Sequence, residues 1–213
     1  MKLVGMLDSP YVRRVAISLE MMGLPFEHEA VSVFSTFAAF QKINPVVKAP
    51  TLVCDDGELI MDSSLILQFA EATKCSGTSL WSTEPAELQH QFKAVGLALA
   101  ACEKNVQLIY ERQLRPAASQ YEPWIERVSA QLLAAYAELE REVQIRSVAF
   151  NTPSSQDTIT AAVAWQFTQS TLADLVLASR HPGLVALSAR MEALPAFVSW
   201  PPVGPGLQAS NKV

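Results

Sequence analysis

The sequence predicts a two-domain chain in which a small α/β domain precedes an all-helical domain. The first part of the chain alternates short apolar segments, typical of buried strands, with segments of helical periodicity. Next comes Lys74–Pro85, a polar segment with Gly, Ser, Thr and Pro, as in many interdomain linkers. Beyond it only helical periodicity remains. We therefore expect domains at residues 1–76 and 86–213, joined by a linker at 77–85.

The first half of the α/β domain has the pattern of strand, helix, strand and helix. The apolar segment Lys2–Leu7 is typical of a buried strand. Ser9 is a favoured N-cap residue, and Pro10 suits the first helical position. A second strand is expected at Phe26–Val33, and a short helix at Phe34–Ile43.

The second half of the α/β domain is a hairpin followed by a helix. Ala49–Val53 is the third expected strand, and Asp55–Gly57 is a hairpin turn signal before the returning strand Glu58–Met61. Asp62–Ser64 then caps a helix that extends to about Ala72. The resulting order, β-α-β-α-β-β-α, predicts a small mixed sheet.

The second domain contains several amphipathic helices around one buried helix. Thr158–Phe167 is apolar nearly all round, as a central buried helix would be. The segment from Trp200 onward is expected to be irregular. The apolar stripes of the other helices are Phe92, Val95, Leu99, Cys102, Val106 and Ile109; then Ile125, Val128, Leu132, Leu139 and Val143; then Leu184, Leu187, Met191 and Leu194.

Composition excludes several classes of protein. The net charge of −5 and the pI near 5.2 argue against a nucleic-acid partner. Cys54, Cys75 and Cys102 lie far apart without a CxxC, so neither a disulfide framework nor a metal site is predicted. Neither a signal peptide nor an apolar stretch long enough to span a bilayer is visible. We expect a cytoplasmic protein without a membrane partner.

Four local motifs together carry a resemblance to a known family. They are Ser9–Arg13 after the first strand, Asn44–Pro50 before the third strand, Asp62-Ser63 at a helix start, and Ser154–Asp157 before the buried helix. In this order and spacing they resemble the cytosolic glutathione S-transferase family over nearly the whole chain. The resemblance is to a bacterial, Ser-type member with a theta/zeta-like N-terminal domain. It implies a thioredoxin-like α/β domain that binds glutathione and an all-α domain that forms the electrophile pocket.

The resemblance assigns the catalytic role to Ser9. A thiol must ionise to become a nucleophile, and an unperturbed thiol has a pKa of about 8.5. A helix N-terminus carries unpaired N–H groups and a partial positive charge, and a hydroxyl there donates to sulfur. A simple helix N-cap is the alternative interpretation of the same residue. Tyr11, Arg13 and Tyr110 are candidates for supporting the site or lining the pocket.

The resemblance also implies which residues bind glutathione. A cis peptide before Pro50 would expose the Ala49 backbone to pair with the cysteinyl backbone of glutathione. The N-terminus of the helix at Ser63 would take the γ-glutamyl carboxylate. The expected glutathione-binding residues are Lys48, Ala49, Pro50, Asp62 and Ser63. Ser154 and Asp157 are interpreted as a structural helix cap.

The expected activity is attack of the glutathione thiolate on a small hydrophobic electrophile, a detoxification reaction. Glutathione is then a co-substrate, no cofactor or metal is implied, and the resemblance implies a homodimer. Two alternatives stay open. One is a glutathione-binding or regulatory protein of the same fold that does not catalyse. The other is a glutathione-dependent reductase, isomerase or dehalogenase, which would share the cleft and differ in the pocket.

Overall fold

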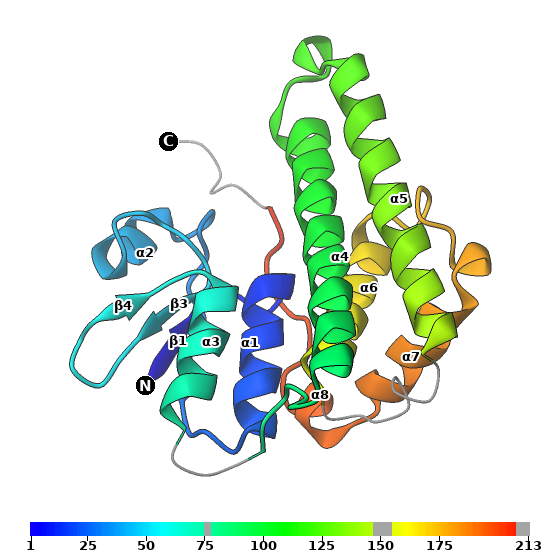
Figure 1. Ribbon diagram of the computed structural model, residues 1–213. Helices are drawn as coiled ribbons and strands as arrows, with labels where there is room; N and C mark the ends of the chain where they lie inside the picture. Colours follow the sequence, from blue (N-terminus) through cyan, green and yellow to red (C-terminus); the bar gives the residue numbers. More distant parts are fainter. Residues whose placement is uncertain (75–77, 147–154, 208–213) are drawn as a thin grey trace. The chain divides into compact units, whose positions relative to one another are not determined.

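The computed structural model describes residues 1–74, 78–146 and 155–207 (Figure 1). Its contacts divide the chain into two compact units. The first contains residues 1–80 together with the segment that begins at Pro195, and the second contains Trp81–Leu194. No helix in the described ranges is both long and apolar enough to cross a membrane.

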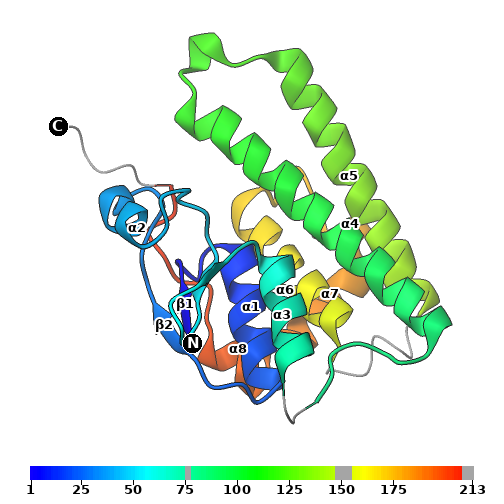
Figure 2. The same ribbon diagram turned by 60° about the vertical axis from the view of Figure 1, so that its left-hand side comes forward.

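The first unit has the predicted order β-α-β-α-β-β-α and the predicted mixed sheet. Its strands lie in the order β2-β1-β3-β4; β1 and β2 are parallel, whereas β3 is antiparallel to both β1 and β4. Helices α1 and α3 lie side by side against the sheet (Figures 1 and 2). The elements are β1 (Lys2–Val4), α1 (Pro10–Met21), β2 (Glu27–Glu29), α2 (Phe37–Ile43), β3 (Thr51–Val53), β4 (Leu59–Ile60) and α3 (Ser63–Thr73).

Close packing of α1 on the end of β1 requires a glycine. Gly5 follows β1 with a φ of +142°, and a Cβ at this position would lie 2.6 Å from a methyl carbon of Val12. Val12, Val15 and Leu19 on α1 are fully buried. A side chain at position 5 would therefore push α1 away from the sheet.

Helix α2 begins three residues later than predicted because side chains organise the preceding turn. Ser32 Oγ accepts hydrogen bonds from the backbone N–H groups of Phe34 and Ser35, both at 3.1 Å. The Ser32 N–H donates to Thr36 Oγ1 at 2.8 Å. Serine and threonine side chains that bond to nearby backbone groups in this way compete with helix formation.

The second unit is all helical, as predicted. Helices α4 and α5 form a long pair, and α6 packs against α4 and α7 (Figure 1). The predicted central helix is confirmed, since α6 buries residues on every side. Phe92 differs from prediction: it is 57% exposed and stacks on Trp81. The α-helices of this unit are α4 (Pro85–Ile109), α5 (Glu122–Ile145), α6 (Gln156–Thr171) and α7 (Pro182–Glu192).

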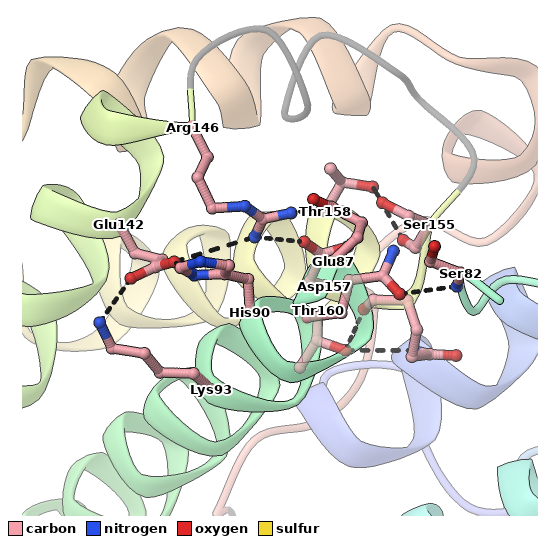
Figure 3. A network of polar contacts seen from close by, with 12 residues as sticks. Ser82, Glu87, His90, Lys93, Glu142, Arg146, Ser155, Asp157, Thr158 and Thr160 are labelled. Atoms are coloured by element: carbon pink, nitrogen blue, oxygen red, sulfur yellow. Dashed lines mark hydrogen bonds and ion pairs between the residues drawn. The ribbon is translucent and has the colours of Figure 1, made fainter. Parts of the chain in front are cut away.

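A buried carboxylate joins α4 to α5 (Figure 3). Glu142 on α5 is 2% exposed and accepts hydrogen bonds from His90 Nδ1 and Lys93 Nζ on α4, both at 2.6 Å. Burial by itself raises the pKa of Glu142, but the bonds from Lys93 and His90 outweigh it and hold the pKa below 4.5.

Arg146 extends this network to the start of α6 (Figure 3). Its guanidinium pairs with Glu87 on α4, and its Nη1 lies 3.3 Å from Asp157 Oδ2 on α6. The arginine and Asp157 are both buried. Charged groups thus connect three helices of the second unit.

The segment from Pro195 packs on the first unit, whereas the sequence suggested that the helical domain would continue to residue 213. The reason is Arg13 of α1, which is 1% exposed. Its Nε donates to Trp200 O at 2.8 Å, and its Nη2 donates to Phe197 O at 3.4 Å. Phe197 lies on the short helix α8 (Pro195–Ser199), and its ring lies 5.4 Å below the guanidinium carbon.

We expect Arg13→Met to lower the free energy of unfolding by about 3 kcal/mol. Methionine fills similar space but leaves the Phe197 and Trp200 carbonyls without their charged donor. Urea denaturation followed by circular dichroism measures the change. Arg127→Met, at an exposed position on α5, is the matched control and should change stability by less than about 0.5 kcal/mol. Equal effects of the two substitutions would contradict the anchoring role of Arg13.

We expect the Glu142 network to make stability depend on pH below about 4.5. A folded-state pKa held below 4.5 contributes stability that is complete above this value and is lost as the pH falls through the folded pKa. Glu142→Gln should therefore cost about 2 kcal/mol at pH 7 and lose less stability than the wild type on acidification. Urea titrations between about pH 3 and 7 test this, and parallel losses in both proteins would contradict it.

Candidate functional site

The first candidate segment is the connection between β1 and α1. Ser9 has N-cap geometry, with φ −75° and ψ 122°, and its carbonyl accepts the Arg13 N–H at 3.0 Å. Its hydroxyl, however, makes no capping bond to the helix, and the first turn of α1 carries no acidic residue. Among the described residues, the half-buried Ser9 hydroxyl makes no hydrogen bond, and it lies beside the positive end of α1.

The second segment, residues 44–51, is a loop held in shape by its own side chains. The Asn44 amide donates to Thr51 Oγ1 at 2.9 Å, and Thr51 Oγ1 donates to Lys48 O at 2.6 Å. The Ala49-Pro50 peptide is cis, which confirms the prediction from sequence. Lys48 is exposed at this loop, and no ion pair joins it to any residue that the structure describes.

Val47 occupies an unfavourable backbone conformation in the same loop. Its φ of +53° lies in the left-handed region, where a branched side chain crowds the backbone. The Val47 N–H donates to Asn44 O at 2.9 Å, so the turn is hydrogen-bonded despite this cost. Such residues persist where the surrounding structure fixes them, often next to binding sites.

The third segment is the start of α3. Asp62 is the N-cap, and its Oδ1 accepts the Ser64 N–H at 2.8 Å. Ser63 is 3% exposed, and its hydroxyl accepts a hydrogen bond from Arg14 Nη1 at 3.1 Å. The same guanidinium nitrogen lies 3.4 Å from Ser64 Oγ.

Arg14 is a candidate site residue that the sequence analysis missed. It is 2% exposed on α1, and it brings a positive charge to the N-terminus of α3, which is already positive. Two positive groups at one place favour a bound anion. Two adjacent arginines in an otherwise apolar helix were the available signal, but only Arg13 was considered.

The sheet brings the three segments to one edge. In the β1–β3 pair, Val4 lies opposite Thr51, so the chain that leaves β1 and the chain that enters β3 meet there. A Cβ on Gly5 would lie 3.3 Å from the Ala49 side chain. Ile60 pairs with Leu52, which places the end of β4 and the following start of α3 at the same edge.

The remaining predicted residues lie elsewhere or have other partners. Tyr11 is half buried in the first turn of α1, whereas Arg13 points to the segment after Pro195 rather than to Ser9. Tyr110 belongs to the second unit, follows α4, and has a pKa raised by burial. Ser154 lies outside the described residues. Ser155 is the N-cap residue of α6, and Asp157 pairs with Arg146.

Comparison with known proteins relates the first unit to a family. Residues 3–75 match the family model described as the glutathione S-transferase N-terminal domain. A stretch of 122 residues is 33% identical to the uncharacterized GST-like protein YibF of Escherichia coli K12, over 57% of this chain and 59% of that protein. Glutathione S-transferase U4 of Arabidopsis thaliana is 27% identical over 97 residues, which cover 45% of this chain and 40% of the relative. The chain thus matches less than two thirds of the length of these relatives.

Solved structures extend the likeness to both units. A glutathione S-transferase from Methylobacterium radiotolerans, in complex with glutathione sulfonate, has a TM-score of 0.86 at 28% identity and is covered over 95% of each chain. A glutathione transferase family member from Pseudomonas fluorescens Pf-5 with bound glutathione shares the fold. Its TM-score is 0.84 at 24% identity, over 95% of this chain and 99% of that one.

Together these findings define the class of protein. The chain has the glutathione transferase architecture, a thioredoxin-like βαβαββα unit followed by an all-helical unit. Residues 3–75 are similar to the N-terminal domain of glutathione S-transferases, and a stretch of 122 residues is similar to a GST-like protein.

We expect Val47→Gly to stabilise the protein by about 1 kcal/mol, because glycine adopts a positive φ without steric cost. The gain should appear as a higher urea midpoint with an unchanged dependence on urea. Val46→Gly is the control, since Val46 is exposed and has no positive φ; it should bring no gain. A loss of stability in Val47→Gly would contradict the assignment of strain to Val47.

Proposed function

We propose that this protein is a glutathione transferase in which Ser9 activates the glutathione thiol for attack on a small hydrophobic electrophile. One observation carries the proposal: the Ser9 hydroxyl stands unused beside the positive end of α1, at the sheet edge where the cis-proline loop and the start of α3 also meet. A residue that acts only as a helix cap typically uses its hydroxyl to accept an N–H of the first turn, and Ser9 makes no such bond.

In the proposed reaction, the thiol loses its proton to solvent and the Ser9 hydroxyl donates a hydrogen bond to the resulting thiolate. The partial positive charge at the start of α1 adds to this stabilisation. A sulfur lone pair then forms the bond to the electrophilic carbon. The bond to the leaving group breaks, and the leaving group takes its electron pair.

The other two segments would hold the peptide. The backbone of the half-buried Ala49 would pair with the cysteinyl backbone of glutathione, as an added strand does. The exposed ammonium group of Lys48 would bind the glycyl carboxylate. At the other end, the start of α3 with Arg14 behind Ser63 would bind the γ-glutamyl carboxylate, and Asp62 would bind its ammonium group.

The comparisons support this proposal at the level of the fold and the ligand. The Methylobacterium radiotolerans structure is named a glutathione S-transferase and holds glutathione sulfonate. We further propose a Ser-type, theta/zeta-like N-terminal domain, a homodimer, and an electrophile pocket in the helical unit near Tyr110.

We expect glutathione bound to the wild type to have a thiol pKa below about 8.5, and Ser9→Ala to raise it toward that value. The alanine variant loses the hydroxyl donor while retaining the helix N-terminus and the other binding residues. Titration of the thiolate absorbance of bound glutathione measures both values. The matched control is Ser9→Thr, which keeps a hydroxyl and should keep most of the shift.

Each outcome of this titration has a distinct meaning. If glutathione binds tightly but its thiol pKa is not lowered, the protein is a non-catalytic glutathione-binding protein of the same fold and not a transferase. A lowered pKa that Ser9→Ala leaves unchanged would remove Ser9 from the mechanism. No binding of glutathione to the wild type would overturn the proposed function.

A further inference from the structure

The segment 201–207, here called the strap, runs past the loop that carries Ser9. At its base, Trp200 O accepts the hydrogen bond from Arg13 Nε at 2.8 Å. Near its other end, the Gly206 N–H donates to Asp8 Oδ2 at 2.8 Å. Ser9 lies in the chain between Asp8 and Arg13, so the strap and Trp200 at its base contact residues on both sides of Ser9. All of these residues belong to the first unit.

The contact with Asp8 is close as well as hydrogen-bonded. A Cβ built on Gly204 would lie 2.2 Å from both the carboxyl carbon and Oδ2 of Asp8. Any side chain at position 204 would therefore force the strap and the Asp8 carboxylate apart. Glycine at this position lets the backbone approach the carboxylate.

The two ends of the strap are held with unequal strength. Its base is fixed by a large contact, because the Trp200 ring stacks on Phe26 with ring centroids 5.0 Å apart and meets the His28 ring edge-on at 5.7 Å. The indole N–H also donates to Glu20. Beyond this base, the described strap is exposed or half exposed, and its link to the Ser9 loop is the single bond to Asp8.

A segment with a firm base and one exposed bond at its tip opens more easily than the core around it. We propose that Asp8 is a positioning residue that tethers the strap against the Ser9 loop, and that opening of the strap controls how fast glutathione enters and leaves. The inference rests on the proposed function, because it takes the Ser9 loop as the place where the glutathione thiol binds.

The tether acts on rates more than on affinity. When the strap must open for glutathione both to enter and to leave, a weaker tether raises both rate constants by a similar factor. The dissociation constant, which is their ratio, then changes little. Loss of a hydrogen bond to a charged acceptor is expected to raise the open fraction, and with it both rates, by roughly tenfold.

Two variants loosen the tether from opposite sides. Asp8→Ala removes the acceptor, and Gly204→Ala leaves Asp8 intact but separates it from the strap. Asp8→Asn keeps a side-chain oxygen in place and should restore wild-type behaviour to within about twofold. Asp174→Ala, at an exposed position in the second unit, removes the same charge and is the control.

Hydrogen exchange measures the tether without any ligand. Asp8→Ala and Gly204→Ala should speed exchange of the Gly206 amide, which bonds to Asp8, roughly tenfold, while Asp8→Asn and Asp174→Ala stay near wild type. Stopped-flow measurement of thiolate absorbance on mixing with glutathione then gives the association and dissociation rate constants. Both constants should rise together in the two loosened variants.

The two measurements separate the possible failures. Unchanged exchange in Asp8→Ala and Gly204→Ala would overturn the tether. Faster exchange with unchanged glutathione rates would overturn control of access while leaving the proposed function standing. If no form binds glutathione, the proposed function falls, and access control falls with it.

Discussion

Two consecutive arginines on α1 are buried, and the geometry of the first unit depends on how each is satisfied. A buried guanidinium is costly unless its N–H groups find acceptors. Arg13 finds carbonyl oxygens after Pro195 and thereby attaches a segment more than 180 residues away in sequence to the first unit. Arg14 finds the hydroxyl groups at the start of α3. A single helix thus carries Ser9 at its N-terminus and fixes two other parts of the chain beside it.

The residues that hold the first unit together also shape its candidate anion-binding region. The positive ends of α1 and α3, together with Arg14, create a region that favours anions, as a peptide with carboxylate and thiolate groups requires. The loop between them is rigid because Asn44 and Thr51 bond across it, and it tolerates a positive φ at Val47. Rigid positioning of donors before the ligand arrives is what makes such a site effective, since little reorganisation remains to be done.

Sequence patterns predicted much of the first unit because its signals are local. The Ser-Pro helix start, the Asp-Asp-Gly turn and the capping Asp62 each act within a few residues of their own position, and the structure places elements accordingly. The patterns failed where side chains decided between alternatives. Helix α2 begins later than predicted because Ser32 and Thr36 bond to each other in the preceding turn. Phe92 is not part of the buried face of α4, because its ring stacks on Trp81. Arg14 was missed because periodicity does not tell which long polar side chain turns inward.

The sequence by itself determined the order of elements and the change from α/β to all-α, since these follow from hydrophobic periodicity and turn chemistry. The candidate residues are also sequence predictions, but they come from the resemblance of four local motifs to the glutathione S-transferase family; they are Ser9, Lys48, Ala49, Pro50, Asp62 and Ser63. Only the tertiary structure decided that the segment after Pro195 packs on the first unit, that Arg14 stands behind Ser63, and that Asp8 holds the strap. The physical reason is that these three features are hydrogen bonds between residues 49 to 198 positions apart. Such bonds form only where the fold brings the partners together, and no local pattern encodes them.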